Sequence, residues 1–241
     1  MQSEGRESGR PEIGARIARA LGHAWYRGVD YAWALREIAR GLADPGLPLQ
    51  YARGSAAPVL LLPGVLENWT MMRGIASRLN AAGHPIHALH ELGRNTVTVP
   101  EASALGTAYL LAEDLNRVIL VAHSKGGLIG KHMMLGGEGH RIDRLVAVST
   151  PFGGSGLARL IPHPVISAFD PRDATIVDLA ARSEVDERIV SIYPEFDPHI
   201  PGGSRLEGAR NVALRSAGHF RVLGDPAVIS AVLDAVSDVR P

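Results

Sequence analysis

The sequence predicts an α/β protein with a mostly parallel sheet of six strands, helices on both faces of the sheet, and a helical extension at the N-terminus. From Pro58 onward, short apolar runs alternate with longer stretches whose apolar residues recur every three or four positions. Several of the short runs are apolar throughout, which is typical of strands that are covered on both faces. We therefore divide the chain into an extension and linker, 1–57, and a domain, 58–241.

The extension contains one long predicted helix, from Pro11 to about Gly41. Apolar side chains recur there at every fourth position: Ile13, Ile17, Leu21, Trp25, Val29 and Trp33. The Pro and Gly residues of 42–57 indicate a linker. Packing of the helix on the domain is the simplest interpretation. Two others stay open for residues 13–40, a peripheral contact with a membrane surface and a dimer contact.

Six predicted strands and five predicted helices follow in alternation. The strands are 59–62, 86–89, 117–122, 144–149, 188–193 and 211–214. The helices are 67–82, 101–115, 125–135, 173–183 and 226–237. Segment 153–185, between the fourth and fifth strands, is rich in apolar residues. It suits either a small cap over a site or plain packing onto the core.

The composition excludes several classes of function. The 241 residues include 25 Lys and Arg and 25 Asp and Glu, a balance that argues against a strongly basic nucleic-acid-binding protein. The absence of cysteine excludes disulfides, cysteine-ligated zinc and a thiol nucleophile. The polar start has no signal-peptide pattern, and no apolar run approaches the roughly 20 residues that span a bilayer. We therefore expect a cytoplasmic protein, with peripheral membrane contact as the alternative.

The strongest motif lies where the third predicted strand meets the next helix, at Ala122–Gly126. A sharp strand-to-helix turn requires small residues two positions before and two positions after the serine, here Ala122 and Gly126. Such a turn lifts the Ser124 hydroxyl above the carboxyl ends of the strands, where reactive groups of α/β sheets are found. Ser124 is therefore the candidate nucleophile. We expect the side chain of Lys125 to point to solvent.

A serine nucleophile needs a base, and the base needs an orienting acid. For this type of turn the chain order is serine, acid, histidine. Asp197 follows the fifth predicted strand and His219 follows the sixth. Asp170 and Asp173 compete for the acid role but suit a helix cap better. His199 competes for the base role but lies only two residues from the acid. The sequence therefore predicts a triad of Ser124, Asp197 and His219.

These motifs resemble the α/β-hydrolase superfamily and, within it, the small bacterial lipases and esterases. The Ala-x-Ser-x-Gly turn is typical of that branch. Residues 149–155, Ser-Thr-Pro-Phe-Gly-Gly-Ser, are similar to a stretch of bacterial lipases, and the residues around Asp197 and His219 are similar to the family's acid and histidine loops. The resemblance covers residues 58–238 and implies a minimal α/β-hydrolase fold.

The resemblance also implies a function: cleavage of carboxylic esters, lipid-like or short-chain, through an acyl-enzyme on Ser124 and without a metal or organic cofactor. The backbone N–H groups of Val65 and Lys125 would form the oxyanion hole. Pro63 stands where the family usually has His, so the geometry of this loop departs from the pattern. Thioester cleavage, amide cleavage and acyl transfer by the same residues remain alternatives. A non-catalytic, membrane-associated module that kept the fold is another.

Four further histidines are expected to have structural roles. His84, His87 and His90 match no common zinc motif. His123, beside the candidate nucleophile, is expected to be packed and hydrogen-bonded.

Overall fold

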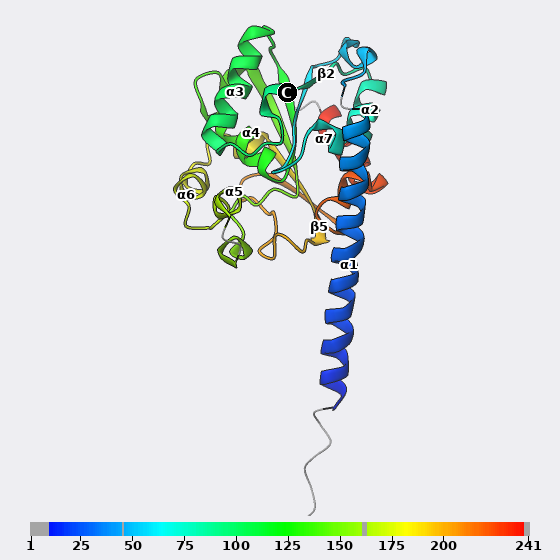
Figure 1. Ribbon diagram of the computed structural model, residues 1–241. Helices are drawn as coiled ribbons and strands as arrows, with labels where there is room; N and C mark the ends of the chain where they lie inside the picture. The colour runs from blue at the N-terminus through cyan, green and yellow to red at the C-terminus, as the bar shows by residue number, and fades with distance from the viewer. Residues whose placement is uncertain (1–9, 45, 161–162, 239–241) are drawn as a thin grey trace, which may run out of the picture.

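Six parallel strands form the central sheet of the computed structural model, which describes residues 10–44, 46–160 and 163–238, with only the backbone of 10–23 and Pro164. The strand order is β2-β1-β3-β4-β5-β6, and every neighbouring pair is parallel. The predicted parallel sheet is confirmed (Figure 1). The strands are β1 (Val59–Leu62), β2 (Ile86–Ala88), β3 (Val118–His123), β4 (Ile142–Val148), β5 (Ile189–Phe196) and β6 (Arg210–Ala217).

Helices occupy the connections between the strands. The α-helices are α1 (Arg10–Ala43), α2 (Arg73–Ala81), α3 (Val99–Ala112), α4 (Lys125–Leu135), α5 (Pro164–Ser167), α6 (Ala174–Ala181) and α7 (Pro226–Ser237). The short 3-10 helices are η1 (Leu49–Ala52), η2 (Trp69–Met72), η3 (His90–Leu92), η4 (Gly139–Arg141), η5 (Gly156–Leu160), η6 (Asp186–Arg188) and η7 (Arg221–Gly224).

Each face of the sheet has its own apolar core, because successive side chains of a strand point to opposite faces. Leu61 and Val121 belong to the core shared with α1, α2 and α7, whereas Leu62 and Leu120 belong to the core shared with α3, α4 and α6. Figure 1 shows these two helical layers on either side of the strands. Burial on both faces explains why the strands are apolar throughout rather than alternating.

Side-chain caps move the helix starts away from the predicted positions. The predicted helix 67–82 opens instead as η2, where Asn68 Oδ1 accepts a hydrogen bond from the Thr70 N–H at 3.0 Å, and the α-helix begins only at Arg73. α3 begins two residues earlier than predicted, because Thr98 and Glu101 form a reciprocal capping box. Asp173 caps α6, which is the role that competed with a catalytic one.

The last two strands run three residues beyond their predicted ends, to Phe196 and Ala217. Phe196 and Ala217 are paired in the ladder, and the Gly218 N–H donates to the Phe196 carbonyl at 2.9 Å. Asp197 and His219 therefore emerge side by side from neighbouring strands.

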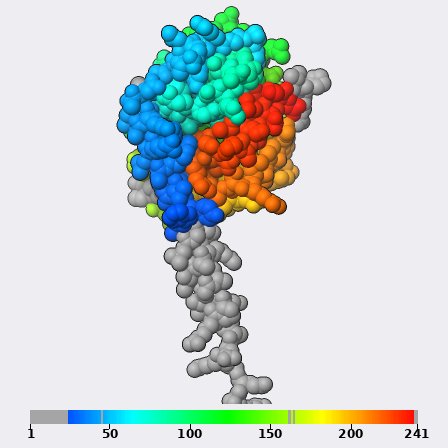
Figure 2. Space-filling view, turned by 90° about the vertical axis from the view of Figure 1, so that its right-hand side faces the viewer, coloured from blue at the N-terminus to red at the C-terminus, as the bar shows by residue number. Residues whose placement is uncertain are grey.

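Helix α1 packs on the domain along its second half. Gly41 allows a close approach, since a Cβ atom there would lie 2.1 Å from Thr70 Oγ1. Figure 2 shows the described part of α1 (blue) against both the cyan residues near η2 and the orange-to-red residues near η7. The predicted apolar positions Ile13, Ile17 and Leu21 lie outside the described side chains.

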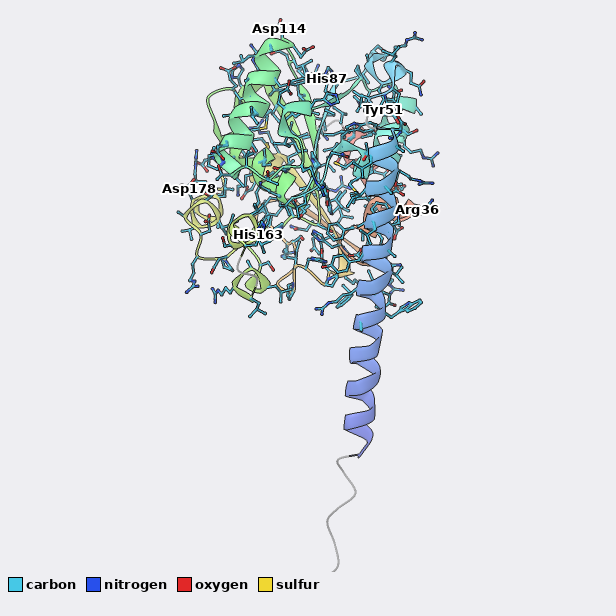
Figure 3. All side chains as sticks on the ribbon, viewed as in Figure 1. Arg36, Tyr51, His87, Asp114, His163 and Asp178 are labelled. Atoms are coloured by element: carbon cyan, nitrogen blue, oxygen red, sulfur yellow. The ribbon has the colours of Figure 1, made fainter. Side chains whose placement is uncertain are left out.

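The described part of segment 153–185 contributes side chains to the core. Phe169, Ile176 and Leu179 are buried in the same cluster as the strand residues. His163 and Asp178 mark this segment in Figure 3, on the opposite side of the molecule from α1. Within the described ranges, no helix is both long enough and apolar enough to cross a bilayer.

Candidate active site

Ser124 occupies a strained turn between β3 and α4. Its backbone has φ 49° and ψ −118°, a region that a non-glycine residue rarely adopts. A Cβ atom at Gly126 would lie 1.9 Å from the Leu62 carbonyl oxygen, and one at Gly127 would lie 2.0 Å from Thr150 Oγ1. The turn therefore needs its glycines because α4 begins in contact with the end of β1 and with the segment after β4.

The structure brings the three predicted triad residues together. Ser124 Oγ lies 3.0 Å from His219 Nε2, and His219 Nδ1 lies 2.8 Å from Asp197 Oδ2. A carboxylate can only accept, so Nδ1 carries the proton in the neutral ring and Nε2 is left to accept from the serine hydroxyl. Ser124 is 5% exposed, and the side chains of His219 and Asp197 are 6% and 5% exposed. This is the geometry that a serine nucleophile, its base and an orienting acid require.

The charges of the pair suit a base that becomes cationic. Burial alone would lower the pKa of His219, but the carboxylates of Asp197, Glu67 and Asp30 raise it above the ordinary value of 6.5. Burial alone would raise the pKa of Asp197, but the charge and hydrogen bond of His219 and the N–H of His199 hold it below its ordinary value. The lowered pKa keeps Asp197 ionised beside the His219 ring.

The loop after Asp197 fixes the acid. Asp197 Oδ1 accepts from the N–H groups of His199 at 2.8 Å and Ile200 at 3.1 Å. The His199 ring stacks on the His219 ring with centroids 4.8 Å apart. Burial, followed by the charge of His219, lowers the pKa of His199 to about 4, so this ring is neutral at pH 7. His199 packs against the candidate base and does not replace it.

His123 is packed and hydrogen-bonded, as expected. Its Nε2 lies 3.0 Å from the His219 carbonyl oxygen, and its Nδ1 lies 2.9 Å from Glu67 Oε2. A carbonyl oxygen only accepts, so Nε2 must be the donor in its contact with His219. Glu67 also accepts from the Gly64 N–H at 2.8 Å. The pair thus joins the loop after β1 to the backbone of His219.

The expectation that Lys125 points to solvent is wrong. The residue is 1% exposed, and its ammonium donates to the carbonyl oxygens of Asn95, at 3.0 Å, and Val97. Burial lowers the pKa of Lys125 to about 8. Asn95 Nδ2 in turn donates to the Pro63 carbonyl at 2.7 Å. The lysine turns inward because main-chain carbonyls there supply the acceptors that water would supply outside.

The oxyanion donors implied by the resemblance lie on two adjacent strand ends. Val65 is on the loop after β1, Lys125 is the first residue of α4, and β1 pairs with β3. The N-terminus of α4 adds its partial positive charge at this place. Two hydrogen bonds hold this loop: the Gly64 N–H donates to Glu67, and the Pro63 carbonyl accepts from Asn95.

The sequence did not predict a role in this region for three residues: Glu67, Asn95 and Asp30. Asp30, on α1, accepts from the N–H groups of the turn that carries His219. An acidic residue within the apolar stripe of a helix was the available signal for Asp30. Glu67 and Asn95 lie in loops without periodicity, and nothing in the pattern distinguishes them.

Two of the other histidines, His84 and His87, have hydrogen-bond partners of their own. His84 Nδ1 lies 2.8 Å from the Ala57 carbonyl oxygen, and His87 Nδ1 lies 3.0 Å from the Tyr109 hydroxyl. In the described part of the chain, no three metal-binding side chains are grouped to hold an ion. A groove of about 620 Å³ runs between α1 and the ends of β5 and β6, but Ser124 does not line it, so we do not assign it to the substrate.

No protein-family model matches the chain, and no curated protein matches it. Solved structures do. An extracellular α/β-hydrolase from a Paenibacillus species is 16% identical with a TM-score of 0.55, over 76% of this chain and 100% of that one. An α/β-hydrolase fold protein from Burkholderia ambifaria is 20% identical with a TM-score of 0.58, over 78% and 92%. The mature lipase of Bacillus licheniformis is 15% identical with a TM-score of 0.58, over 77% and 92%.

These likenesses extend over the sheet and its helical layers at low sequence identity. Together with the parallel strand order and the strained serine turn after β3, they agree with the resemblance carried by the motifs. The chain has the α/β-hydrolase fold.

Proposed function

We propose that this protein is a serine hydrolase that cleaves carboxylic esters. The observation that carries the proposal is the unbroken hydrogen-bonded chain from Ser124 through His219 to Asp197 on a strained turn. Several proteins of similar fold are described as lipases or esterases, among them the Bacillus licheniformis enzyme. An ester suits the site better than a polyanion, since the chain has no net charge.

In the proposed reaction, Ser124 Oγ attacks the ester carbonyl carbon while His219 Nε2 takes the hydroxyl proton. The backbone N–H groups of Val65 and Lys125 receive the negative oxygen. His219 then protonates the leaving alcohol, and the acyl group stays on Ser124. Water, deprotonated by His219, attacks the acyl carbon, and the acid leaves as Ser124 regains its proton. Asp197 stabilises the imidazolium in both halves.

A fluorophosphonate probe tests the proposal directly. We expect the folded chain to be labelled at Ser124 and the Ser124→Ala variant to remain unlabelled, because only a serine with a neighbouring base reacts readily with this probe. Mass spectrometry of the labelled peptide identifies the residue. A panel of chromogenic esters, thioesters and amides of increasing acyl length then defines the substrate, with esters expected to react fastest. Labelling elsewhere, or no labelling of folded protein, would contradict the mechanism. Faster thioester or amide cleavage would favour the alternatives.

We also propose that the exposed side of α1 contacts a membrane surface. Leu35 and Leu42 are seven residues apart on one stripe of the helix and are 67% and 76% exposed. Trp25 is 71% exposed, and its amphipathic ring suits an interface. Arg36 points away from the domain (Figure 3), and with the exposed Arg40 it would meet lipid phosphates.

Co-sedimentation with anionic phospholipid vesicles tests this contact. We expect the full chain to sediment with the vesicles and the double variant Leu35→Ser, Leu42→Ser to stay in solution, since it loses the apolar stripe. Leu111→Ser, on α3 and also partly exposed, is the control and should bind as the unaltered chain does. No sedimentation of the unaltered chain would refute the proposal. A dimer that the double variant disperses would indicate a dimer contact in its place.

A further inference from the structure

The carboxylate of Asp30 is fully buried beneath the turn that follows β6. Its Oδ1 accepts from three consecutive backbone N–H groups, those of His219 at 3.0 Å and of Phe220 and Arg221 at 2.9 Å. Its Oδ2 accepts again from His219, at 3.0 Å. Hydrogen bonds to an ionised acceptor are among the stronger ones in proteins, and a buried carboxylate requires them.

The turn is shaped around this carboxylate. Gly218 has φ 114°, and a Cβ atom there would lie 2.6 Å from Asp30 Oδ1, so only glycine fits. The main chain of His219 is thereby held at both ends, its N–H by Asp30 and its carbonyl by His123. Its side chain is held between Ser124 and Asp197.

Helix α1 is anchored firmly enough to act as the support. Its Trp33 ring lies so close to Gly224 that a Cβ atom there would be 3.1 Å from the indole nitrogen. The Tyr31 ring lies 5.4 Å from the His199 ring and 5.9 Å from the Phe220 ring. These ring contacts and the contact at Gly41 hold α1, and with it Asp30, in place on the domain.

We propose that Asp30 is a positioning residue of the active site: it fixes the backbone of His219 and so keeps the imidazole aligned between Ser124 and Asp197. The inference rests on the proposed hydrolase function. It makes α1 a working part of the active site rather than an appendage, although Asp30 precedes His219 by 189 residues. Asp30 touches neither substrate nor reacting atoms, and it acts through the main chain of His219.

Removal of the carboxylate and removal of its charge have separable effects. Asp30→Ala deletes the acceptor, and we expect kcat to fall about 10- to 100-fold with a smaller change in KM, as for a catalytic group displaced by about 1 Å. Asp30→Asn keeps an oxygen in the Oδ1 position, so kcat should stay within about 10-fold of the unaltered value. A merely structural role would lower the yield of folded protein and leave kcat per folded molecule unchanged.

The pH profile provides a second readout. The groups that face His219 are the carboxylates of Asp197, Glu67 and Asp30, the rings of His123 and His199, and, one turn away, Arg221 bonded to the Ala217 carbonyl. The negative charge of Asp30 contributes to the raised pKa of His219. Because the base works only as neutral imidazole, activity of the unaltered enzyme falls as pH drops through that pKa. Asp30→Asn should lower the pKa and move this acid limb to lower pH.

The experiment measures kcat, KM and the acid limb for the two variants, and the pKa of the His219 ring by NMR. Glu37→Gln is the matched control, since Glu37 is nearly buried on the same helix but pairs with Arg40 of that helix; it should change none of these values. Folded Asp30→Ala with unaltered kcat, or Asp30→Asn with an unshifted His219 pKa, would overturn the proposal. If Asp30→Ala does not fold, Asp30→Asn decides. The NMR pKa is read without turnover, so failure of the unaltered chain to cleave esters refutes the hydrolase proposal separately.

Discussion

Replacing Ser124 by alanine is expected to lower ester hydrolysis by a factor on the order of 10⁵–10⁶, and His219→Ala should lower it by a similar factor. Neither residue works without the other: the hydroxyl is a weak nucleophile until His219 Nε2, 3.0 Å away, takes its proton. The double variant should therefore be no slower than either single variant, although two independent effects would multiply. Residual hydrolysis, about 10³–10⁴ above the uncatalysed rate, would come from the oxyanion donors and from binding.

Initial rates with one chromogenic ester, normalised to folded protein, check this expectation. Ser103→Ala is the control, because it deletes another nearly buried hydroxyl. The Ser103 hydroxyl, on α3, contacts His132 of α4. It should retain nearly full activity. Ser124→Ala with unaltered activity, or a double variant far slower than the singles, would show that the two residues do not act as one unit.

Most of the sheet could be predicted, because strands that are buried on both faces are continuous runs of apolar residues in the sequence. Val118–His123 is apolar up to the histidine and is followed by Ser124, Lys125 and two glycines, so strand, turn and helix are visible within residues 117–128. The chain order of serine, acid and histidine then located the other two positions without any contact information. The carboxyl ends of parallel strands lie at the same edge of the sheet. Ser124, Asp197 and His219 each follow such a strand end and therefore lie together.

The hydrogen bonds that hold the candidate site in place could not be predicted, because they join residues that are far apart in the sequence. Glu67 and His123 are 56 residues apart, and nothing local marks either as the other's partner. Lys125 was expected to point to solvent, whereas its acceptors are main-chain carbonyls whose direction no residue type encodes. A periodic pattern reports which face of an element is buried, but it does not report which polar group is satisfied there.

The two lysines of the chain are both buried on α4. Replacing one of them, Lys131, is expected to have a large effect on stability. The Lys131 ammonium lies 2.7 Å from Asp186 Oδ1, and the two side chains are 1% and 5% exposed. The pair joins α4, which directly follows Ser124, to η6, which leads into β5, the strand that Asp197 follows.

Lys131→Met should therefore reduce the free energy of unfolding by about 3–5 kcal/mol, because it leaves the Asp186 carboxylate buried without a counter-charge. At about 2–4 °C per kcal/mol for a chain of this size, the melting temperature should fall by roughly 6–20 °C. Denaturant unfolding at a fixed temperature measures the free energy. The double variant Lys131→Met, Asp186→Leu should recover most of the loss, since an apolar pair of similar volume replaces two desolvated charges.

The pair Arg210–Asp238 supplies the matched control. Its atoms are also 2.7 Å apart, but its side chains are 39% and 37% exposed. Arg210→Met should cost no more than about 1 kcal/mol, because water screens that pair and solvates whichever charge is left. Equal losses at the two sites would mean that the Lys131 pair is solvated. Failure of the double variant to recover would mean that the ion pair itself, and not the cost of an orphaned charge, holds α4 to η6 and so the nucleophile to the strand of its acid.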